Sequence, residues 1–183
     1  MPKVSEAHKE RRREQILEAA RRCFARYGYE GATVARLEEE TGLSRGAIFN
    51  YFASKDALFV ELALETSKRL TGVWLEQGFR AVLEAIANED ADWLSVQFEA
   101  TRRVRTDATF RRLIEEREQE IEGTRHERLE QLRPHVRDDV PVEQVAAFLG
   151  LVANGLALRQ STGEPLPDLD AVAKLVDQGA APR

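Results

Sequence analysis

The segment SRGAIFNYF, residues 44–52, gathers side chains that suit contact with a phosphodiester backbone and with the edges of bases. Arg45 can pair with phosphate or with a guanine edge, and Asn50 carries an amide that donates and accepts hydrogen bonds. Tyr51 presents a hydroxyl on a rigid arm. Gly46 has no side chain at the point where a nucleic-acid backbone would approach most closely. These four residues form a candidate surface for reading double-stranded DNA.

Three further candidates, Thr33, Ser44 and Lys55, lie at the N-termini of expected helices. Thr and Ser side chains accept hydrogen bonds from the free backbone N–H groups there, and these N–H groups and the helix dipole attract phosphate. Gly42 permits the positive φ that a tight turn between two helices needs. The pattern predicts a helix-turn-helix whose second helix starts after Ser44 and is seven or eight residues long.

Helices are predicted almost throughout, because apolar residues recur at helical spacing and no long stretch alternates as a strand would. We expect an all-α fold of about nine helices, with a helix-turn-helix domain at 1–54 and an effector-binding and dimerisation domain at 55–183. In the first domain, Phe49 and Phe52 are expected in the core and Tyr51 outside it. Gly28 suits a helix end and Thr106 a helix start. The later helices are expected at 55–77, 79–88, 92–105, 107–133, 141–162 and 168–179.

Composition excludes several classes of protein. The 183 residues are 43% hydrophobic and 32% charged, which is ordinary for a folded helical protein. One cysteine, Cys23, allows no internal disulfide, and the N-terminus lacks a secretory signal. The apolar run 145–158 is judged too short to span a bilayer. We therefore expect a cytoplasmic protein that does not enter a membrane.

Charge is unevenly divided along the chain. The net charge is −5, which alone argues against nucleic acid as a partner. Residues 1–60 hold 11 Lys and Arg against 9 Asp and Glu, whereas residues 61–183 hold 16 against 23. Such a field orients an approaching protein with its first 60 residues toward DNA.

The expected helix at 141–162 is apolar on nearly every face. A helix of this kind must be buried on all sides. Burial against a second copy of the chain is one solution. A central core helix in a monomer is the other.

The stretch FARYGYEGATVARLEEETGLSRGAIFNYFASKDALFVELA, with its F-x-x-K-x-x-L-F ending, resembles the DNA-binding domain of TetR-family transcriptional regulators. This resemblance implies a homodimeric repressor whose two N-terminal heads read a palindromic DNA operator. It also implies that the helices near 141–162 and 168–179 form a four-helix dimer interface, and that the C-terminal domain binds a small-molecule effector. The helix at 55–77 would carry the signal between the two domains.

Within that family, the segments DWLSVQFE and RTDATFR resemble the citrate-responsive aconitase repressors of actinobacteria. This branch implies citrate bound with Mg²⁺ and control of aconitase. Matching positions are the main chain at Phe79 and Arg80, the side chain of Arg128, and Asp177 as the metal ligand. Two positions depart from the pattern, Leu132 and Ala181, and put citrate recognition in doubt. A largely apolar effector, acting on efflux or degradation genes, is the competing expectation.

The expected helix at 107–133 carries Arg117 and Arg128 on an otherwise apolar stripe. Because an unpaired buried guanidinium is costly, either the two side chains reach out to solvent or an anion lies inside. Polar residues near other apolar stripes could complete a pocket. They are Gln97, Glu99, Asn154 and Arg159.

No catalytic or metal-binding pattern accompanies these features. The three histidines are His8, His126 and His135, and no two of them have metal-ligand spacing. No nucleophile has a partnering base, so an enzyme is not expected. A helical dimer that binds a protein partner in place of DNA is the main rival interpretation, and it predicts no salt-dependent affinity for DNA.

Overall fold

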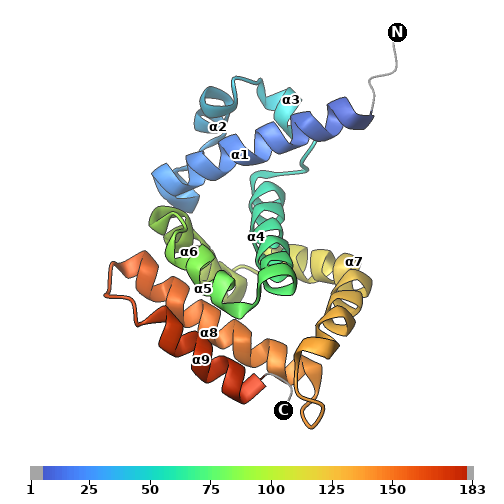
Figure 1. The fold of residues 1–183 in the computed structure, drawn as a ribbon. Coiled ribbons are helices and arrows are strands. Elements are labelled where there is room, and N and C mark those ends of the chain that lie inside the picture. The colour runs from blue at the N-terminus through green and yellow to red at the C-terminus, as the bar shows by residue number, and fades with distance from the viewer. Residues whose placement is uncertain (1–5, 181–183) are drawn as a thin grey trace.

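The computed structural model describes residues 6–180, except the side chains of residues 118, 120–126 and 128. Within this part the chain forms nine α-helices, one short 3-10 helix and no strand, so the all-α prediction is confirmed (Figure 1). The α-helices are α1 (Glu6–Gly31), α2 (Val34–Thr41), α3 (Arg45–Phe49), α4 (Lys55–Gln77), α5 (Phe79–Ala87), α6 (Ala91–Thr106), α7 (Ala108–Leu132), α8 (Val142–Thr162) and α9 (Leu169–Ala180), and the 3-10 helix is Arg133–His135.

Local signals fix the first three helices. The side chain of Thr33 accepts the N–H of Arg36 at the start of α2, and Ser44 accepts the N–H of Ala47 at the start of α3. Between them Gly42 has φ 66°, a left-handed conformation that costs other residues energy. Figure 1 shows α2 and α3 together against α1, at the opposite end of the molecule from α8 and α9. We call α1, α2 and α3 the head, and α4 to α9 the body.

The first helix does not stop at Gly28 but continues, with a kink, to Gly31. Gly28 has φ 70° and ψ 172°, a region that is essentially restricted to glycine. The backbone N–H of Tyr29, freed by the kink, donates to Glu99 of α6 at 3.1 Å. A side chain of the body therefore supplies the hydrogen-bond acceptor that the helix itself does not offer to this N–H group at the end of α1.

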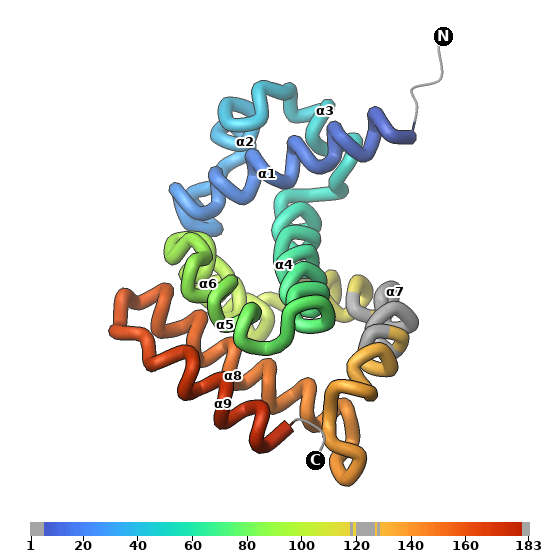
Figure 2. Tube along the Cα trace, in the orientation of Figure 1, coloured from blue at the N-terminus to red at the C-terminus, as the bar shows by residue number. Residues whose placement is uncertain are grey.

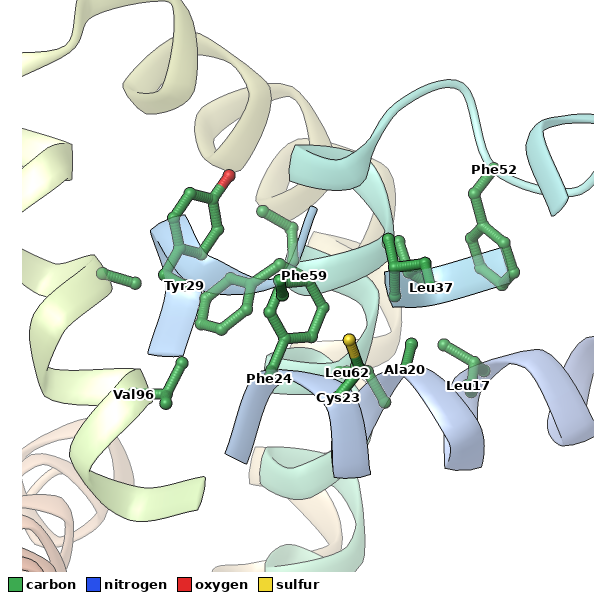
Figure 3. Close-up of a cluster of buried hydrophobic side chains, with 14 of the residues drawn as sticks. Leu17, Ala20, Cys23, Phe24, Tyr29, Leu37, Phe52, Phe59, Leu62 and Val96 are labelled. Atoms are coloured by element: carbon green, nitrogen blue, oxygen red, sulfur yellow. The ribbon is translucent and has the colours of Figure 1, made fainter. Parts of the chain in front are cut away.

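A core of aromatic side chains joins the head to the body. Phe24 and Tyr29 of α1 pack with Phe59 of α4, with ring centroids 5.1–5.8 Å apart. Phe59 also packs with Trp93 of α6, at 5.8 Å. Figure 3 shows Cys23, Leu37 and Phe52 in the same cluster, and Cys23 is fully buried as expected. The division of the chain at residue 54 stays a prediction, because this core crosses it.

A second core lies at the far end of the body, where α5 packs on both α8 and α9 (Figure 2). In the single chain α8 is not buried on all sides, so the alternative of a central core helix in a monomer is wrong, and burial against a second copy stays a prediction. The exposed fractions of four large side chains on α8 and α9 are Phe148 47%, Leu151 72%, Leu158 48% and Leu175 69%.

The length of α8 also corrects an expectation. By length and composition alone, Val142–Thr162 is able to cross a membrane, with a mean hydropathy of 1.2. The helix extends beyond the apolar run 145–158 at both ends. Apolar helices of soluble proteins meet the same criterion, so it does not assign α8 to a bilayer.

Candidate nucleic-acid interface and ligand cavity

The third helix is shorter than its sequence predicts. It ends at Phe49, after five residues, and Asn50 closes it with a backbone N–H bond to the carbonyl of Gly46 at 3.1 Å. Tyr51 then donates its N–H to the carbonyl of Ile48 at 3.0 Å, a tighter turn than that of an α-helix. Asn50 and Tyr51 therefore lie on the turn after α3 and not on the helix itself.

Four of the candidate DNA-contacting residues are exposed on α3 and its flanks: Ser44, Arg45, Gly46 and Asn50. Apart from its chain neighbours and the backbone of its own helix, no atom lies within 4 Å of the position that a Cβ on Gly46 would occupy. Internal packing therefore does not require a glycine there. The guanidinium of Arg45 lies 5.9 Å from the ring centroid of Phe49, which holds it beside the helix while it stays exposed.

The other three candidates are held more firmly. Thr33 is exposed but caps α2. Tyr51 is half-buried against the aromatic core, as is Phe49, whereas Phe52 is buried. Lys55 is also half-buried, and its Nζ donates to the backbone carbonyl of Tyr29 at 2.9 Å. The same Nζ lies 4.5 Å from the centroid of the Tyr29 ring. Lysine has three donors, so two N–H groups of its ammonium remain for another partner.

Two adjoining cavities of about 420 and 520 Å³ lie in the body between α4, α5, α6, α7 and α8. Their shared wall carries three apolar and four neutral polar side chains: Ala63, Leu70, Ala153, Thr66, Ser67, Gln97 and Asn154. Glu143 is the only charged residue among the described lining residues. The cavities can enclose a mainly apolar molecule and offer it hydrogen bonds.

The predicted effector residues are only partly brought together. Phe79 and Leu132 line the larger cavity. The side chain of Arg80 is exposed, where it pairs with Asp170 of α9 and with Glu84. The bond from Arg80 holds the pKa of the Asp170 carboxyl below its ordinary value. The side chain of Arg128, and Ala181, lie outside the described residues.

The proposed metal ligand, Asp177, is exposed on α9. In the part of the chain that the structure describes, no three His, Cys, Asp or Glu residues gather as a metal site. Magnesium is commonly held by one or two carboxylates, with waters and the oxygens of a bound ligand completing the shell. The residues present fit only a Mg²⁺ that the effector itself helps to coordinate.

Sequence reasoning missed Glu61 of α4, the partner that explains Arg117. Arg117 donates through Nε and Nη2 to Glu61 Oε2, at 3.1 and 2.5 Å. Its charge therefore meets a carboxylate inside the protein, which was neither of the expected alternatives. The only signal was an acidic residue among the apolar positions of FVELAL, and an exposed face gives the same signal.

Of the four polar candidates for a pocket, Gln97 and Asn154 line the cavities. The other two are engaged elsewhere: Glu99 accepts the N–H of Tyr29, and Arg159 pairs with Glu164.

Comparison with known proteins gives a consistent result along the chain. Residues 16–62 match the bacterial regulatory proteins of the tetR family, and residues 64–181 match the C-terminal domain of BetI-type transcriptional repressors. The HTH-type transcriptional repressor Rv1474c of Mycobacterium tuberculosis is 45% identical, over 97% of both chains. The repressor AcnR of Corynebacterium glutamicum is 41% identical over 90% of both. The structure of Salmonella enterica GusR superposes with a TM-score of 0.65 at 20% identity, covering 96% of this chain and 97% of that one.

Proposed function

Because this chain belongs to the TetR family of bacterial transcriptional regulators, a family of DNA-binding repressors and not of enzymes, we propose that α3 and its flanks read its operator. The observation that carries the proposal is the capped, glycine-turned α3, which leaves Arg45 and Asn50 exposed beside a side-chain-free Gly46. Arg45 and Asn50 would contact base edges, and Gly46 would admit the phosphate backbone.

Four residues would hold the backbone on either side of the bases. Ser44 and Thr33 would bind phosphate at the starts of α3 and α2, where backbone N–H groups and the helix dipole favour anions. Tyr51 would contribute its hydroxyl, and Lys55 the two donors that Tyr29 leaves unused. These contacts would fix the position of the head, while Arg45 and Asn50 would supply sequence preference.

We further propose that two copies associate through α8 and α9. The exposed Phe148, Leu151 and Leu158 follow one another at helical spacing along α8, and Leu175 adds the same character on α9. Facing pairs of α8 and α9 would form a four-helix interface that covers these side chains. Such a dimer would present its two heads to half-sites of a palindrome about 34 Å apart.

The effector is proposed to be citrate, or an anion of that kind, with Mg²⁺, and the target to be an aconitase gene or another gene of central carbon metabolism. The resemblance to aconitase repressors supports this, as does the start of α5, whose N-cap Gly78 gives no side-chain hydrogen bond. Phe79, the first residue of α5, lines the larger cavity, and in this proposal the free N–H groups of this turn would bind the anion. Arg128 would add a cation, and Asp177 would hold the metal ion.

A second candidate is a neutral, largely apolar effector. The lining favours it, because the described side chains include no cation and mainly offer alkyl, aromatic, hydroxyl and amide groups. In either case release from DNA would be a population shift: the ligand would bind better to an arrangement whose heads are wrongly spaced for the operator.

The DNA-binding proposal is tested by locating the protein's sites across its own genome and measuring affinity for them at several salt concentrations. Tyr51→Phe and Lys55→Ala should weaken binding to operator and to unrelated DNA alike, and the lysine change should also reduce the salt dependence. Unchanged affinity in both variants would reject these roles. A protein with no salt-dependent affinity for DNA would support the rival of a protein-binding dimer.

The effector proposal is tested by thermal denaturation with citrate and Mg²⁺ together, each alone, and citrate with a chelator. A ligand that binds the folded state raises Tm. Citrate with Mg²⁺ should raise it most, Arg128→Ala should abolish the rise, and Asp177→Asn should remove the part that depends on the metal ion. Stabilisation by an apolar compound but not by citrate would favour the second candidate.

A further inference from the structure

Besides the aromatic core, carboxylates also join the head to the body by bridging α1 to another helix. Three of them do so at successive points along α1, which contributes Arg13, Arg21 and Tyr29. The three bridges are Arg13–Glu61–Arg117, Arg21–Glu89–Arg69 and Tyr29–Asp56–Arg103. The first bridge is the one that reaches α7, and α4, α6 and α7 all contribute to the walls of the ligand cavity.

Glu61 is the only buried charged residue in the described part of the chain, with 7% of its surface exposed. Its two oxygens have different partners: Oε1 accepts from Arg13 of α1, and Oε2 accepts from Arg117 of α7. A buried carboxylate depends on such partners, since the loss of one leaves charge without compensation. A shift of α7 relative to α4 would therefore act directly on this group.

The cavity lies immediately beside this bridge. Val60, the neighbour of Glu61 on α4, lines the 420 Å³ cavity, and so does Ile114, which is three residues before Arg117 on α7. A ligand between these two side chains would tend to part α4 from α7. The same displacement would draw Arg117 away from Glu61.

At its other end the bridge reaches the DNA-reading segment. The guanidinium of Arg13 lies 5.7 Å from the centroid of the Phe52 ring. Phe52 is buried and directly follows Tyr51 on the turn after α3. Arg13 also contacts Glu65 of α4, at 3.2 Å, so it stays near α4 if Glu61 changes partner.

We propose that Glu61 is a positioning residue that links occupancy of the cavity to the placement of the head, through Arg117 on one side and Arg13 on the other. This inference rests on the proposed function, because it assigns a route to the regulation proposed there. In the DNA-binding arrangement both arginines hold the carboxylate. A ligand that parts α4 from α7 removes Arg117 and leaves the buried carboxylate with Arg13 alone, so Glu61 and Arg13 rearrange together and the head moves out of register with DNA.

The experiment is a double-mutant cycle on two arginines that contact the same carboxylate from different helices. Arg13→Gln, Arg117→Gln and the double variant are compared with the wild-type protein. Arg112→Gln is the matched control, since Arg112 is an exposed arginine on the same helix as Arg117. Two quantities are measured: affinity for a DNA site taken from the protein's own genome, and the distance between spin labels at Ala35→Cys in the head and Gln131→Cys in the body, with labelled protein diluted in unlabelled protein.

Each single change should weaken DNA binding about tenfold, and the double variant should be no weaker than either, because both changes disable one linkage. The label distances should broaden in all three variants and stay unchanged in Arg112→Gln. Effects that multiply to about a hundredfold, or a distance distribution in Arg117→Gln that matches the wild type, would overturn the proposal. If the wild-type protein binds no DNA, the proposed function fails, while the label distances still decide the role of Glu61.

Discussion

Two surfaces of this chain are left uncovered, and they differ in chemistry. Around α3 the exposed side chains are an arginine, a serine and an asparagine beside a bare glycine. On α8 and α9 they are phenylalanine and leucine. The first surface can form hydrogen bonds and ion pairs with a charged partner, whereas burial of the second surface away from water would lower the free energy most. One chain thus carries a surface with the chemistry to bind a polyanion and, at its opposite end, an apolar surface, which the proposed dimer would cover.

The largest expected effect follows from a charge on the apolar surface. Leu151→Glu would place an unpaired carboxylate in the proposed dimer interface, which would cost about 3–5 kcal/mol. Dimerisation should weaken at least about a hundredfold, and operator affinity should fall with it because the two heads are no longer tied together. Analytical ultracentrifugation and a DNA titration measure the two quantities.

Gln119→Glu supplies the control for that change, because Gln119 is exposed on α7 and gains the same charge there. It should leave the dimer intact. A Leu151→Glu protein that remains a dimer at micromolar concentration would show that the apolar surface is not the interface.

A smaller effect is expected at the polar surface. Arg45→Ala should cost about 1–3 kcal/mol of operator binding and relax the preference for the bases it contacts. The exposed Arg26, on α1, provides a comparison, and Arg26→Ala should change affinity by much less. The measurement is binding to the operator and to single-base variants of it. Equal losses on every sequence would make Arg45 a phosphate contact only.

A glycine near each surface allows a sharper comparison, because changing each one to alanine should alter the free energy of unfolding in opposite directions. Gly42 has a positive φ, so Gly42→Ala should destabilise the fold by about 1–2 kcal/mol. Gly155, within α8, has no positive φ and open space around it, so Gly155→Ala should stabilise by about 0.5–1 kcal/mol. Urea unfolding in the Leu151→Glu background measures both without dimerisation. The same sign in both variants would contradict the assigned conformations.

The smallest effect is expected away from both surfaces, at the start of α7. The N–H of Phe110 and the guanidinium of Arg103 bond to Asp107 and hold its pKa below the ordinary value. Because the pKa of Asp107 is lower in the folded protein than in the unfolded chain, its ionised carboxylate stabilises the fold at pH values above the unfolded-state pKa. This stabilisation is lost as the pH falls through the folded-state pKa. Asp107→Asn should therefore flatten the dependence of the urea midpoint on pH below about 4. An unchanged slope would mean that the Asp107 cap makes no measurable contribution to the pH dependence of stability.

Much of the head could be predicted from sequence, because short-range chemistry determines it. Thr33, Gly42 and Ser44 each act on backbone groups within three residues, so their types and spacing predict their roles. The helix α3 is shorter than predicted, because a tighter turn at Tyr51 follows Phe49 and spacing alone does not indicate that turn. Thr106 was expected to cap α7, but Asp107 does so.

The body was predictable in outline only. Helix boundaries there follow apolar periodicity to within a residue or two, but the pairing of Glu61 with Arg117 joins positions 56 residues apart, and nothing local indicates it. The same limit applies to the cavity, whose wall draws on five helices. The position of Arg80 in an ion pair with Asp170 also depends on how α9 packs against α5, which sequence spacing does not reveal.

The aromatic core that crosses residue 54 has a consequence for any attempt to divide the protein. A fragment ending there would expose the inner faces of Phe24 and Tyr29, and would lose the glutamate that completes the bent end of its first helix. We expect such a fragment to be unfolded on its own. The full chain should then melt in a single cooperative step, with the head owing its stability to the body.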